Sequence, residues 1–379
     1  MKRTIFFDEM KKLFKNVFMS NFGSYEMPIY FSGIKEEHLA VRNNVGIFDV
    51  SHMSFISVIG KNSDAFLNQI VTIDIKKKKN YSASYSVICN ENAGIIDDII
   101  IYKIDNDGFF IVSNSENGEK VFKYLKNFKV ENFFKEVKII IEKKVILALQ
   151  GPNSIQILKK IFPENYTKIL NLDYYYFCKI NEYNKNFVIA RTGYTGEIGF
   201  EIILPLNYDD DIFFAINFWK KILEYKVIPC GLGARDVLRL EAGYPLYGNE
   251  LSDKFSPIES GLNWVLDLDK KEVFCGKEIL KLQIKNGINK KIIGLDFEDK
   301  KFIPRHYNEI FFENKNVGFI TSGTFSFFLN KIIALGYLDS DIEIGSKVEV
   351  LIRNKKVNAK ITKPKFYYNS KIKEKLNII

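Results

Sequence analysis

Residues 92–102 read Asn-Ala-Gly-Ile-Ile-Asp-Asp-Ile-Ile-Ile-Tyr, with the adjacent acids Asp97 and Asp98 between two apolar runs. The apolar runs predict a β-strand that is entered from a turn at Ala93-Gly94. Successive side chains of a strand point to opposite faces, so one of the two acids must share the face of the buried residues. A buried carboxylate is costly unless it is paired, hydrogen-bonded or protonated. The alternative is that the strand begins at Asp98 and that both acids lie in a solvated turn, where Asp is common.

The length and composition indicate a globular protein with more than one domain. A chain of 379 residues is longer than one ordinary hydrophobic core supports, so we expect two or three domains. Hydrophobic residues make up 46% of the chain and charged residues 27%, which are globular values, and no apolar run approaches the roughly 20 residues that span a bilayer. We therefore expect a soluble protein with no membrane partner.

The formal net charge of +9 has two interpretations. The lysines are spread over the whole length among many Asn, Ile, Phe and Tyr residues, as a genome-wide codon bias would produce. The other interpretation is a selected basic surface, which could attract an acidic protein partner as readily as a polynucleotide. The sequence lacks the clusters of Lys and Arg with exposed aromatic residues that an RNA-binding module needs, so we expect no nucleic-acid partner.

The cysteines and histidines are too scattered for a disulfide framework or a zinc site. The three histidines lie far apart, which argues against a multi-histidine metal site. The N-terminal region contains Asp8 and Glu9 and lacks the apolar core of a signal peptide. No Cys-x-x-Cys pair occurs among the four cysteines, Cys89, Cys178, Cys230 and Cys275. This pattern indicates a reducing compartment, and we expect a cytoplasmic protein.

Hydrophobic periodicity predicts an α+β protein, because helical and strand-like segments follow one another without a steady β-α-β rhythm. From about Lys281 the pattern changes to short strands with Gly and Asn turns, typical of a small β-barrel or sandwich in a separate C-terminal domain. The predicted helices are 6–18, 34–45, 63–70, 119–128, 153–161, 206–225 and 234–241. The predicted strands are 27–31, 47–58, 83–90, 95–104, 109–112, 137–142, 145–150, 187–190, 291–297, 317–321, 331–337, 347–352 and 356–362.

A glycine-rich segment, residues 191–199, reads Arg-Thr-Gly-Tyr-Thr-Gly-Glu-Ile-Gly. Its glycines do not have the spacing of a dinucleotide-binding fingerprint, and no Lys-Ser/Thr phosphate loop is present. One interpretation is a β-hairpin whose glycines only serve tight turns. The other is a ligand site, because Tyr194 and Glu201 flank the turn and Glu201 stands inside an apolar run. A carboxylate held there can accept paired N–H donors from a ligand.

Arg235 and Arg239 are four residues apart and share one face of a predicted helix. Both can face a common site, or both can form structural ion pairs with acids such as Asp236 or Glu241. His52 lies in a predicted strand, where a lone histidine is more often a hydrogen-bonded structural residue than a base. No nucleophile elbow is present, so these motifs by themselves identify no reaction.

The segments that carry a family resemblance are 33–38 (Gly-Ile-Lys-Glu-Glu-His), 45–53 (Val-Gly-Ile-Phe-Asp-Val-Ser-His-Met), the strand with Asp97 and Asp98, 191–197, 231–243 with Tyr247-Gly248, 321–326 (Thr-Ser-Gly-Thr-Phe-Ser) and 364–367 (Pro-Lys-Phe-Tyr). Together they resemble the aminomethyltransferase of the glycine cleavage system, the T-protein family. They occur in the family's order and cover nearly the whole chain from Thr4 to Tyr367. No single segment is decisive, but the set is highly specific.

The resemblance implies a three-domain cloverleaf with tetrahydrofolate in the middle. Residues 1–280 would form the folate-binding aminomethyltransferase region, built of two intertwined α+β subdomains, and residues 281–379 the C-terminal β-barrel domain. The family passes the carbon of the aminomethyl group on the lipoyl arm of the H-protein to tetrahydrofolate. Ammonia, 5,10-methylenetetrahydrofolate and dihydrolipoyl H-protein result. The resemblance therefore implies tetrahydrofolate as co-substrate, the lipoylated H-protein as partner and no metal.

The resemblance also implies roles for single residues. Asp98 corresponds to the family's catalytic acid beside the folate nitrogens, where it would orient and help deprotonate N5 or stabilise a cationic iminium. Asp97 is then expected to have a solvent-facing or structural role. Glu201 would accept from the aminopyrimidine edge of the pterin, and Arg235 would bind folate while Arg239 stays structural. Three residues are expected to line the pterin ring, namely Tyr85, Tyr194 and Met53. Asn114 is expected to form a hydrogen bond nearby.

This chain departs from the family at three places. Ala93 replaces the usual first glycine of the pair before the acid strand, a mild change if its φ is negative. Cys275 replaces an apolar residue and is expected in the core. The sequence diverges after Phe366, so no folate contact is assigned there. The alternative function is a folate-binding iron–sulfur assembly factor of the same fold, but its Lys-Gly-Cys-aromatic-x-Gly-Gln motif is absent from residues 272–278.

Overall fold

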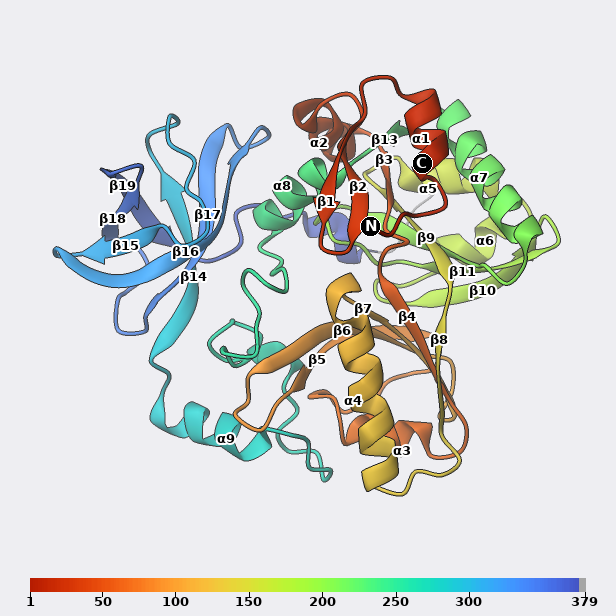
Figure 1. Cartoon of the computed structure of the whole chain (residues 1–379), viewed down its shortest axis with the longest axis horizontal. Coiled ribbons are helices and arrows are strands. Elements are labelled where there is room, and N and C mark those ends of the chain that lie inside the picture. The colour runs from red at the N-terminus through yellow and green to blue at the C-terminus, as the bar shows by residue number, and fades with distance from the viewer. Residues whose placement is uncertain (375–379) are drawn as a thin grey trace.

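The computed structural model describes residues 1–374, which form two sheet-containing lobes and a closed barrel (Figure 1). Helix α8 (Leu232–Ala242) lies between the barrel and the first lobe, and its Leu240 packs on Ile333 and Leu335 of the barrel. The α+β class and the C-terminal barrel predicted from the sequence are confirmed. Within residues 1–374, no helix is long and apolar enough to cross a membrane.

The first lobe contains a six-stranded sheet in the order β10-β11-β12-β9-β3-β13, in which only the β3–β13 pair is parallel. Its core lies between the sheet and the helices, where Trp219 of α7 packs against Phe6. The strands are β3 (Gly46–Asp49), β9 (Lys144–Gln150), β10 (Phe177–Glu182), β11 (Lys185–Ala190), β12 (Gly199–Pro205) and β13 (Ile228–Pro229). The helices are α1 (Phe7–Leu13), α2 (Ile34–Asn43), α5 (Ser154–Ile161), α6 (Tyr166–Leu170) and α7 (Asp209–Glu224).

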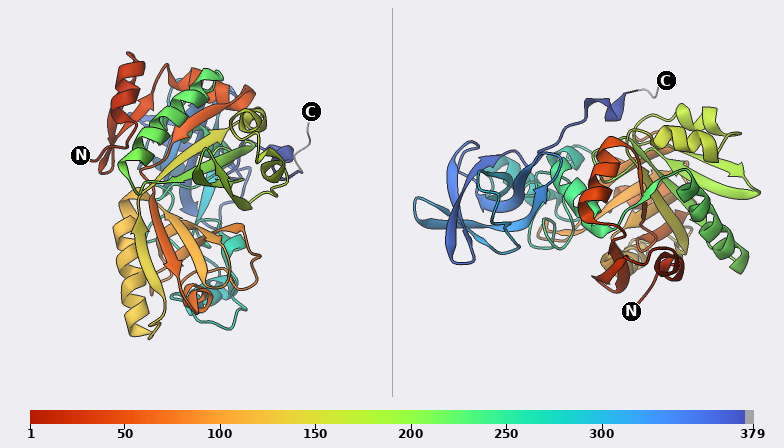
Figure 2. Two further views of the ribbon diagram at one scale, coloured as in Figure 1. Left: turned by 90° about the vertical axis from the view of Figure 1, so that its right-hand side faces the viewer. Right: turned by 90° about the horizontal axis from the view of Figure 1, so that it is seen from above.

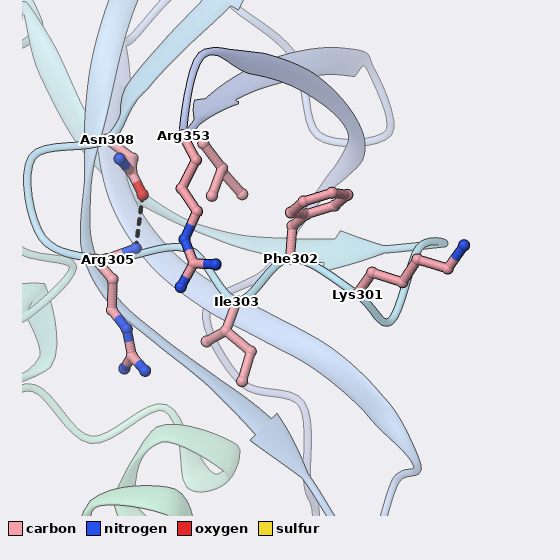
Figure 3. A pocket seen from close by; sticks show the side chains of 7 residues that line it. Lys301, Phe302, Ile303, Arg305, Asn308 and Arg353 are labelled. Atoms are coloured by element: carbon pink, nitrogen blue, oxygen red, sulfur yellow. Dashed lines mark hydrogen bonds between the residues drawn. The ribbon is translucent and has the colours of Figure 1, made fainter.

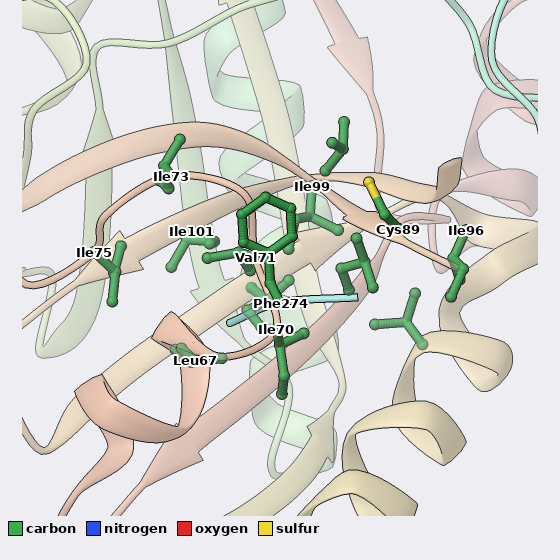
Figure 4. Close-up of a cluster of buried hydrophobic side chains, with 14 of the residues drawn as sticks. Leu67, Ile70, Val71, Ile73, Ile75, Cys89, Ile96, Ile99, Ile101 and Phe274 are labelled. Carbon is green, nitrogen blue, oxygen red and sulfur yellow. The ribbon is translucent and has the colours of Figure 1, made fainter. Parts of the chain in front are cut away.

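The second lobe contains a five-stranded antiparallel sheet in the order β5-β6-β7-β4-β8. Figure 4 shows its buried cluster, in which Ile99 and Ile101 of the acid strand lie near Phe274 from the segment before α9. The strands are β4 (Ser54–Ile59), β5 (Ser82–Cys89), β6 (Ile95–Lys103), β7 (Gly108–Ser113) and β8 (Lys138–Glu142). The helices are α3 (Ser63–Asn68), η1 (Ser115–Asn117), α4 (Gly118–Glu131), η2 (Asn263–Val265) and α9 (Lys277–Asn286).

The barrel closes in the order β14-β17-β16-β15-β18-β19, so its strands leave no open sheet edge. Its core consists of alternate inward-facing residues such as Ile293, Leu295 and Ile320. After β19 the chain returns to the first lobe (Figure 2). There Arg191 donates to the carbonyls of Ile372 and Glu374. The strands are β14 (Lys290–Phe297), β15 (Glu309–Phe312), β16 (Lys315–Ser326), β17 (Lys331–Asp339), β18 (Lys347–Ile352) and β19 (Lys355–Thr362), followed by η3 (Ser370–Lys373).

The predicted strand 47–58 is wrong as a single element, because β3 and β4 belong to different sheets. The Asp49 carboxylate accepts the backbone N–H of Ser51 at 2.9 Å, which ends β3 in a turn. The backbone N–H of Met53 then bonds to the carbonyl of Val50. Hydrophobic alternation continues through this turn, so the break is invisible in the pattern. It places His52 and Met53 at the junction of the two lobes.

Three further expectations need correction. The first helix ends at Leu13, and Phe18–Phe22 is instead strand β1, paired with β2 (Tyr25–Tyr30). Ala93 has a φ of 63°, in the left-handed region that favours glycine, because the side chain of Asn90 accepts the N–H groups of Asn92 and Gly94 and shapes the turn. Cys275 is half-buried and lines a cavity of about 810 Å³ beside Tyr124 and Phe274, so it is not a core residue.

Candidate active site

Strand β6 carries both acids and sends them to opposite faces. Asp97 shares its face with Ile99 and Ile101 of the buried cluster and is 0% exposed. Asp98 shares the other face with Ile100 and Tyr102, which pack in a cluster that joins the two lobes. The strand begins at Ile95 and runs through both acids, so the solvated-turn alternative is wrong.

The amide of Asn114 connects the two carboxylates. Its Nδ2 donates to Asp98 Oδ1 at 2.7 Å and to Asp97 Oδ1 at 2.9 Å. The hydroxyl of Tyr85 donates to Asp98 Oδ2 at 3.0 Å. Asp97 also accepts from Asn117 Nδ2 at 2.7 Å and from the backbone N–H of Asn114 at 3.2 Å. Asp97 is therefore a buried structural acid that holds Asn114, and a solvent-facing role for it is wrong.

Burial raises the pKa of both carboxyl groups above the ordinary value of aspartate. For Asp97, the negative charge of Asp98 raises the pKa further. For Asp98, the hydrogen bonds from Tyr85 and Asn114 stabilise the carboxylate and partly offset the effect of burial. A carboxyl group whose pKa is moved toward neutrality can exchange a proton at physiological pH, which an ordinary aspartate does poorly.

Tyr85 also carries an exposed aromatic surface beside Asp98. The indole of Trp264 stacks on Tyr85 with ring centroids 5.5 Å apart and an interplanar angle of 21°, yet Trp264 is 68% exposed. Exposed tryptophan is uncommon without a binding role. Trp264 was missed from the sequence because nothing in its flanking residues links it to Tyr85, about 180 positions earlier. The only signal was that the chain has just two tryptophans.

Arg235 and Arg239 of α8 have different surroundings. Arg239 pairs with Asp236 at 2.8 Å and with Glu250 at 2.7 Å, which makes it structural. The guanidinium of Arg235 instead lies 4.6 Å from the ring centroid of Tyr194. Within residues 1–374 the Arg235 side chain has no hydrogen bond and no ion pair. Its stacked guanidinium is therefore available to an anionic group of a ligand.

Glu201 lies on β12 opposite Ala190 of β11, so the glycine-rich segment is the hairpin connection of these strands. Its Oε2 accepts from Thr192 Oγ1 at 2.5 Å and from Tyr102 OH at 3.2 Å. No partner for Oε1 occurs in the described part of the chain. Tyr102 lies four residues after Asp98 on the same strand face, and this spacing could have identified it from the sequence. No feature of the sequence identified Thr192 as a residue of the site.

Met53 and His52 approach the site from the turn between the lobes. Met53 packs on the cluster that joins the lobes, without a recorded contact to Asp98. His52 is buried against the rings of Phe22 and Tyr25, and its Nδ1 has no partner among the described residues. Burial, reinforced by the charge of Arg235, lowers the pKa of His52 to about 3, so the ring is neutral at physiological pH. His52 is thus not the hydrogen-bonded residue that its sequence context favoured.

The predicted residues fall into connected groups. Tyr85 and Asn114 bond directly to Asp98, Arg235 stacks on Tyr194, and Glu201 reaches the same face of β6 through Tyr102. In the described residues, no group of three His, Cys, Asp or Glu side chains could hold a metal ion. The arrangement offers a carboxyl group that can exchange a proton, one free carboxylate oxygen that can accept N–H donors, and a guanidinium with no ion pair within residues 1–374.

Comparisons with known proteins agree over the whole chain. Residues 9–270 match the family described as GCVT N-terminal domain, and residues 290–367 match the glycine cleavage T-protein C-terminal barrel domain. Aminomethyltransferases of Thermosipho melanesiensis and Oceanobacillus iheyensis are each 41% identical, over 98% of both chains for the first and over 92% of this chain and 93% of the relative for the second. The crystal structure of glycine cleavage system aminomethyltransferase T from Bartonella henselae is 29% identical, with a TM-score of 0.88 over 99% of both chains. The sequence, the three-part fold and these matches together place the chain in the glycine cleavage T-protein family.

Proposed function

We propose that this chain is the aminomethyltransferase of a glycine cleavage system. It transfers the methylene carbon of the aminomethyl group on the lipoylated H-protein to tetrahydrofolate and releases ammonia. The observation that carries this proposal is the Asp98 carboxyl group, held by Tyr85 and Asn114 with a raised pKa, in a chain whose relatives are named aminomethyltransferases. The iron–sulfur assembly alternative has no supporting observation.

The free polar groups of the site fit the parts of a folate. Glu201 Oε1 can accept from the aminopyrimidine N–H donors while Oε2 stays bound to Thr192 and Tyr102. The unpaired guanidinium of Arg235 can bind a folate carboxylate. Tyr85 and Tyr194 supply aromatic faces, and Met53 supplies a polarizable apolar contact. These assignments, with Asn114 as the support of Asp98, form the proposed folate site.

Asp98 is the proposed catalytic residue, because the transfer needs a proton acceptor at the folate nitrogens. Bonding of the carbon to N5 and N10 of the folate releases two protons. Cleavage of its bonds to the amino nitrogen and to the lipoyl sulfur takes up two, which gives ammonia and the lipoyl thiol. A carboxyl group with a raised pKa can accept the first proton and, as a carboxylate, stabilise positive charge that develops beside it. Tyr85 and Asn114 keep its two oxygens oriented during the transfer.

The direct test measures ammonia release from aminomethylated H-protein by the purified chain, with and without tetrahydrofolate. We expect release that depends on tetrahydrofolate and yields 5,10-methylenetetrahydrofolate in equal amount. A second T-protein of known activity, assayed on the same H-protein preparation, controls for competence of the carrier. Ammonia release by that control but none by this chain would refute the proposed function.

Glu201→Gln is expected to weaken folate binding and to leave the rate at saturation nearly unchanged. The two donors at Oε2 would keep the amide oxygen, so the amide NH₂ would replace the acceptor that faces the ligand. Losing charge-assisted hydrogen bonds costs about 1.5–3 kcal/mol, which corresponds to roughly 10- to 100-fold in Kd. Calorimetric titration with 5-formyltetrahydrofolate measures the change. Glu349→Gln, on the barrel surface, serves as control.

Tyr85→Phe is expected to move the acid limb of the pH–rate profile to higher pH. The hydroxyl stabilises the charged form of Asp98, so its removal raises the pKa of that carboxyl group further. If the bond contributes about 1 kcal/mol, the limb moves by somewhat less than one pH unit. The dependence of kcat on pH, measured for both proteins, gives the result. A limb that stays in place or moves to lower pH would contradict the role of Tyr85.

Trp264 is expected to report folate binding by fluorescence. It stacks on Tyr85 at the site, whereas Trp219, the other tryptophan, is 1% exposed in the core of the first lobe. Binding of 5-formyltetrahydrofolate should therefore quench emission from the wild type. Trp264→Phe should lose most of this quenching while keeping the buried emission. Equal quenching in Trp264→Phe and the wild type would show that Trp264 does not lie at the folate site.

The division of the chain at residue 280 is also part of the proposal. The hydrophobic cluster of the second lobe includes Leu280, and that of the barrel runs from Ile293 to Ile361. The clusters support a folate-binding region and a separate barrel domain, proposed as 1–280 and 281–379, of which 375–379 lie outside the described residues. Helix α9 runs across residue 280 and Ile288 still packs on the second lobe, so the clusters themselves separate between Ile288 and Ile293. The four free cysteines support a cytoplasmic location. The net charge of +9 supports attraction of an acidic carrier. We propose neither nucleic acid nor membrane as partner, because the sequence lacks clusters of Lys and Arg with exposed aromatic residues and long apolar runs.

A further inference from the structure

A separate cavity of about 210 Å³ lies at one end of the barrel (Figure 3). It is enclosed by the segment before β15 and by the turn between β18 and β19. Phe302 and Ile303 pack on the barrel core and form an apolar floor. None of its lining residues belongs to the proposed folate site. The lining residues are Lys301, Phe302, Ile303, Arg305, Asn308, Ile352 and Arg353.

The polar lining of this cavity consists of hydrogen-bond donors. Arg305, Arg353 and Lys301 are cationic, and no carboxylate lines the cavity. The side-chain oxygen of Asn308 accepts the backbone N–H of Arg305 at 2.7 Å, so its NH₂ group remains as a further donor. The nearby Asp299 accepts the backbone N–H of Lys301 at 2.7 Å and does not line the cavity. Such a lining selects an anion.

The choice of arginine at these positions is informative. Of the 55 Lys and Arg residues, 48 are Lys and only seven are Arg, so lysine is the default cation of this chain. Five of the seven arginines have an evident role within the fold or the proposed folate site. Arg3 pairs with Glu26, Arg42 and Arg239 form buried ion pairs, Arg191 binds carbonyls, and Arg235 stacks on Tyr194.

The remaining two, Arg305 and Arg353, are both exposed and both line this cavity. Neither side chain has a hydrogen bond or an ion pair within residues 1–374. Lysine would serve as well for solubility, whereas the planar guanidinium fork is needed to bind an oxyanion through two parallel bonds. Two such forks at one cavity in a lysine-rich chain point to a specific ligand.

The backbone conformation of Arg353 determines where its side chain lies. Arg353 has a φ of 49° and Asn354 a φ of 62°, which is the type I′ geometry of a two-residue hairpin between β18 and β19. Asn or Gly normally occupies the first of these positions, because a larger side chain is strained there. An arginine at this site places its guanidinium beside Ile303 at the cavity (Figure 3). Tyr183 and Glu313 have the same left-handed φ in two other hairpins of this chain, so the turn explains where the Arg353 side chain lies and is not itself a sign of function.

We propose that this cavity binds a phosphate group of a small metabolite, with Arg305 and Arg353 as its principal ligands. The two guanidinium groups match a dianion better than a singly charged carboxylate, and two forks can serve the three terminal oxygens of a phosphate group. The volume is smaller than that of a drug-sized site, so the cavity holds the phosphate group and an adjoining apolar portion over Phe302 and Ile303. This site does not depend on the folate chemistry proposed above.

The test titrates the full chain with inorganic phosphate in chloride buffer and follows binding by calorimetry. We expect one saturable site per chain. Arg305→Lys and Arg353→Lys keep the charge but lose the fork, and each should weaken binding by about tenfold or more. Arg3→Lys, an exposed arginine outside the barrel, is the matched control and should bind as the wild type. Arg353→Asn restores a residue that suits the turn, so it should fold well and lose binding.

Two further titrations test where the anion binds and which anion the site prefers. Phosphate affinity should be unchanged when 5-formyltetrahydrofolate saturates the protein, and acetate should bind more weakly than phosphate. Loss of phosphate binding on adding folate would place the anion at Arg235 and overturn the proposal. So would the absence of saturable binding, an equal loss in Arg3→Lys, full affinity in both Arg353 variants, or a preference for acetate.

Discussion

Asp98→Asn is expected to lower kcat of folate-dependent ammonia release by about 10²- to 10⁴-fold, the usual contribution of a positioned acid–base group. Asparagine has nearly the same shape and keeps one acceptor for Tyr85 or Asn114, so the site should remain folded. Folate affinity should change by only a few fold, because the proposed binding groups are Glu201 and Arg235. A parallel fall of kcat and kcat/KM is the signature of an interaction made in the transition state.

Asp97→Asn is the matched control, one residue away. Asp97 faces the core and its oxygens accept from Asn114 and Asn117, so its replacement should lower stability more than turnover. Turnover at saturating folate and the thermal midpoint, measured for both variants, separate the two roles. A larger loss of turnover in Asp97→Asn than in Asp98→Asn would show that Asp97, and not Asp98, is the catalytic acid. Equal effects of Asp98→Asn and Glu201→Gln on folate affinity would show that binding and catalysis are not divided as proposed.

Glu241→Gln is expected to cause the largest loss of stability. Glu241 is 0% exposed and lies on α8, where its Oε2 accepts from Arg42 Nε at 2.9 Å and Nη2 at 2.6 Å. Its Oε1 bonds to His38 at 2.8 Å and accepts from Ser326 of the barrel. The substitution leaves Arg42 buried with one carboxylate partner, Glu197. Breaking one side of a buried ion pair costs about 3–5 kcal/mol.

In a protein of this size that loss corresponds to a fall of roughly 6–20 °C in the thermal midpoint, since each kcal/mol moves it by about 2–4 °C. Glu278→Gln removes an exposed pair with Lys281 and should change the midpoint by no more than a fraction of that amount. The thermal midpoint is the appropriate quantity because a chain with several domains need not unfold in two states. Equal midpoints for the two variants would show that the Glu241 network does not hold the first lobe, α8 and the barrel together.

The same network has a predictable pH dependence. Burial raises the pKa of Glu241, but the hydrogen bond from His38 and the charge of Arg42 outweigh it, so the net pKa is below the ordinary glutamate value. A depressed carboxyl pKa contributes stability that is present above the unfolded pKa of about 4.5 and is lost as the pH falls through the lower folded pKa. The ion pair therefore supports the fold at neutral pH and contributes to acid denaturation.

The local sequence pattern was sufficient to predict features that depend on a single helix or strand. The apolar runs around Asp97 and Asp98 predicted strand β6, and alternation required that the two acids diverge. Short strands with Gly and Asn turns predicted the C-terminal barrel, although β15 was missed because it has only four residues. The break between β3 and β4 was not predictable, because Asp49 ends the strand through a side-chain hydrogen bond that leaves the apolar alternation unchanged.

By itself, the sequence determined the α+β class, the acid strand and, through ordered motifs, the family. Only the tertiary structure decided which charged side chains have partners. Arg239 forms ion pairs with Asp236 and Glu250, while Arg235, one turn away, has no partner in the described residues. It also decided that Asp97 is buried, that Trp264 lies over Tyr85, and that Arg305 and Arg353 share a cavity. The physical reason is that periodicity assigns a side chain to a face, whereas its partner depends on which distant segment packs against that face.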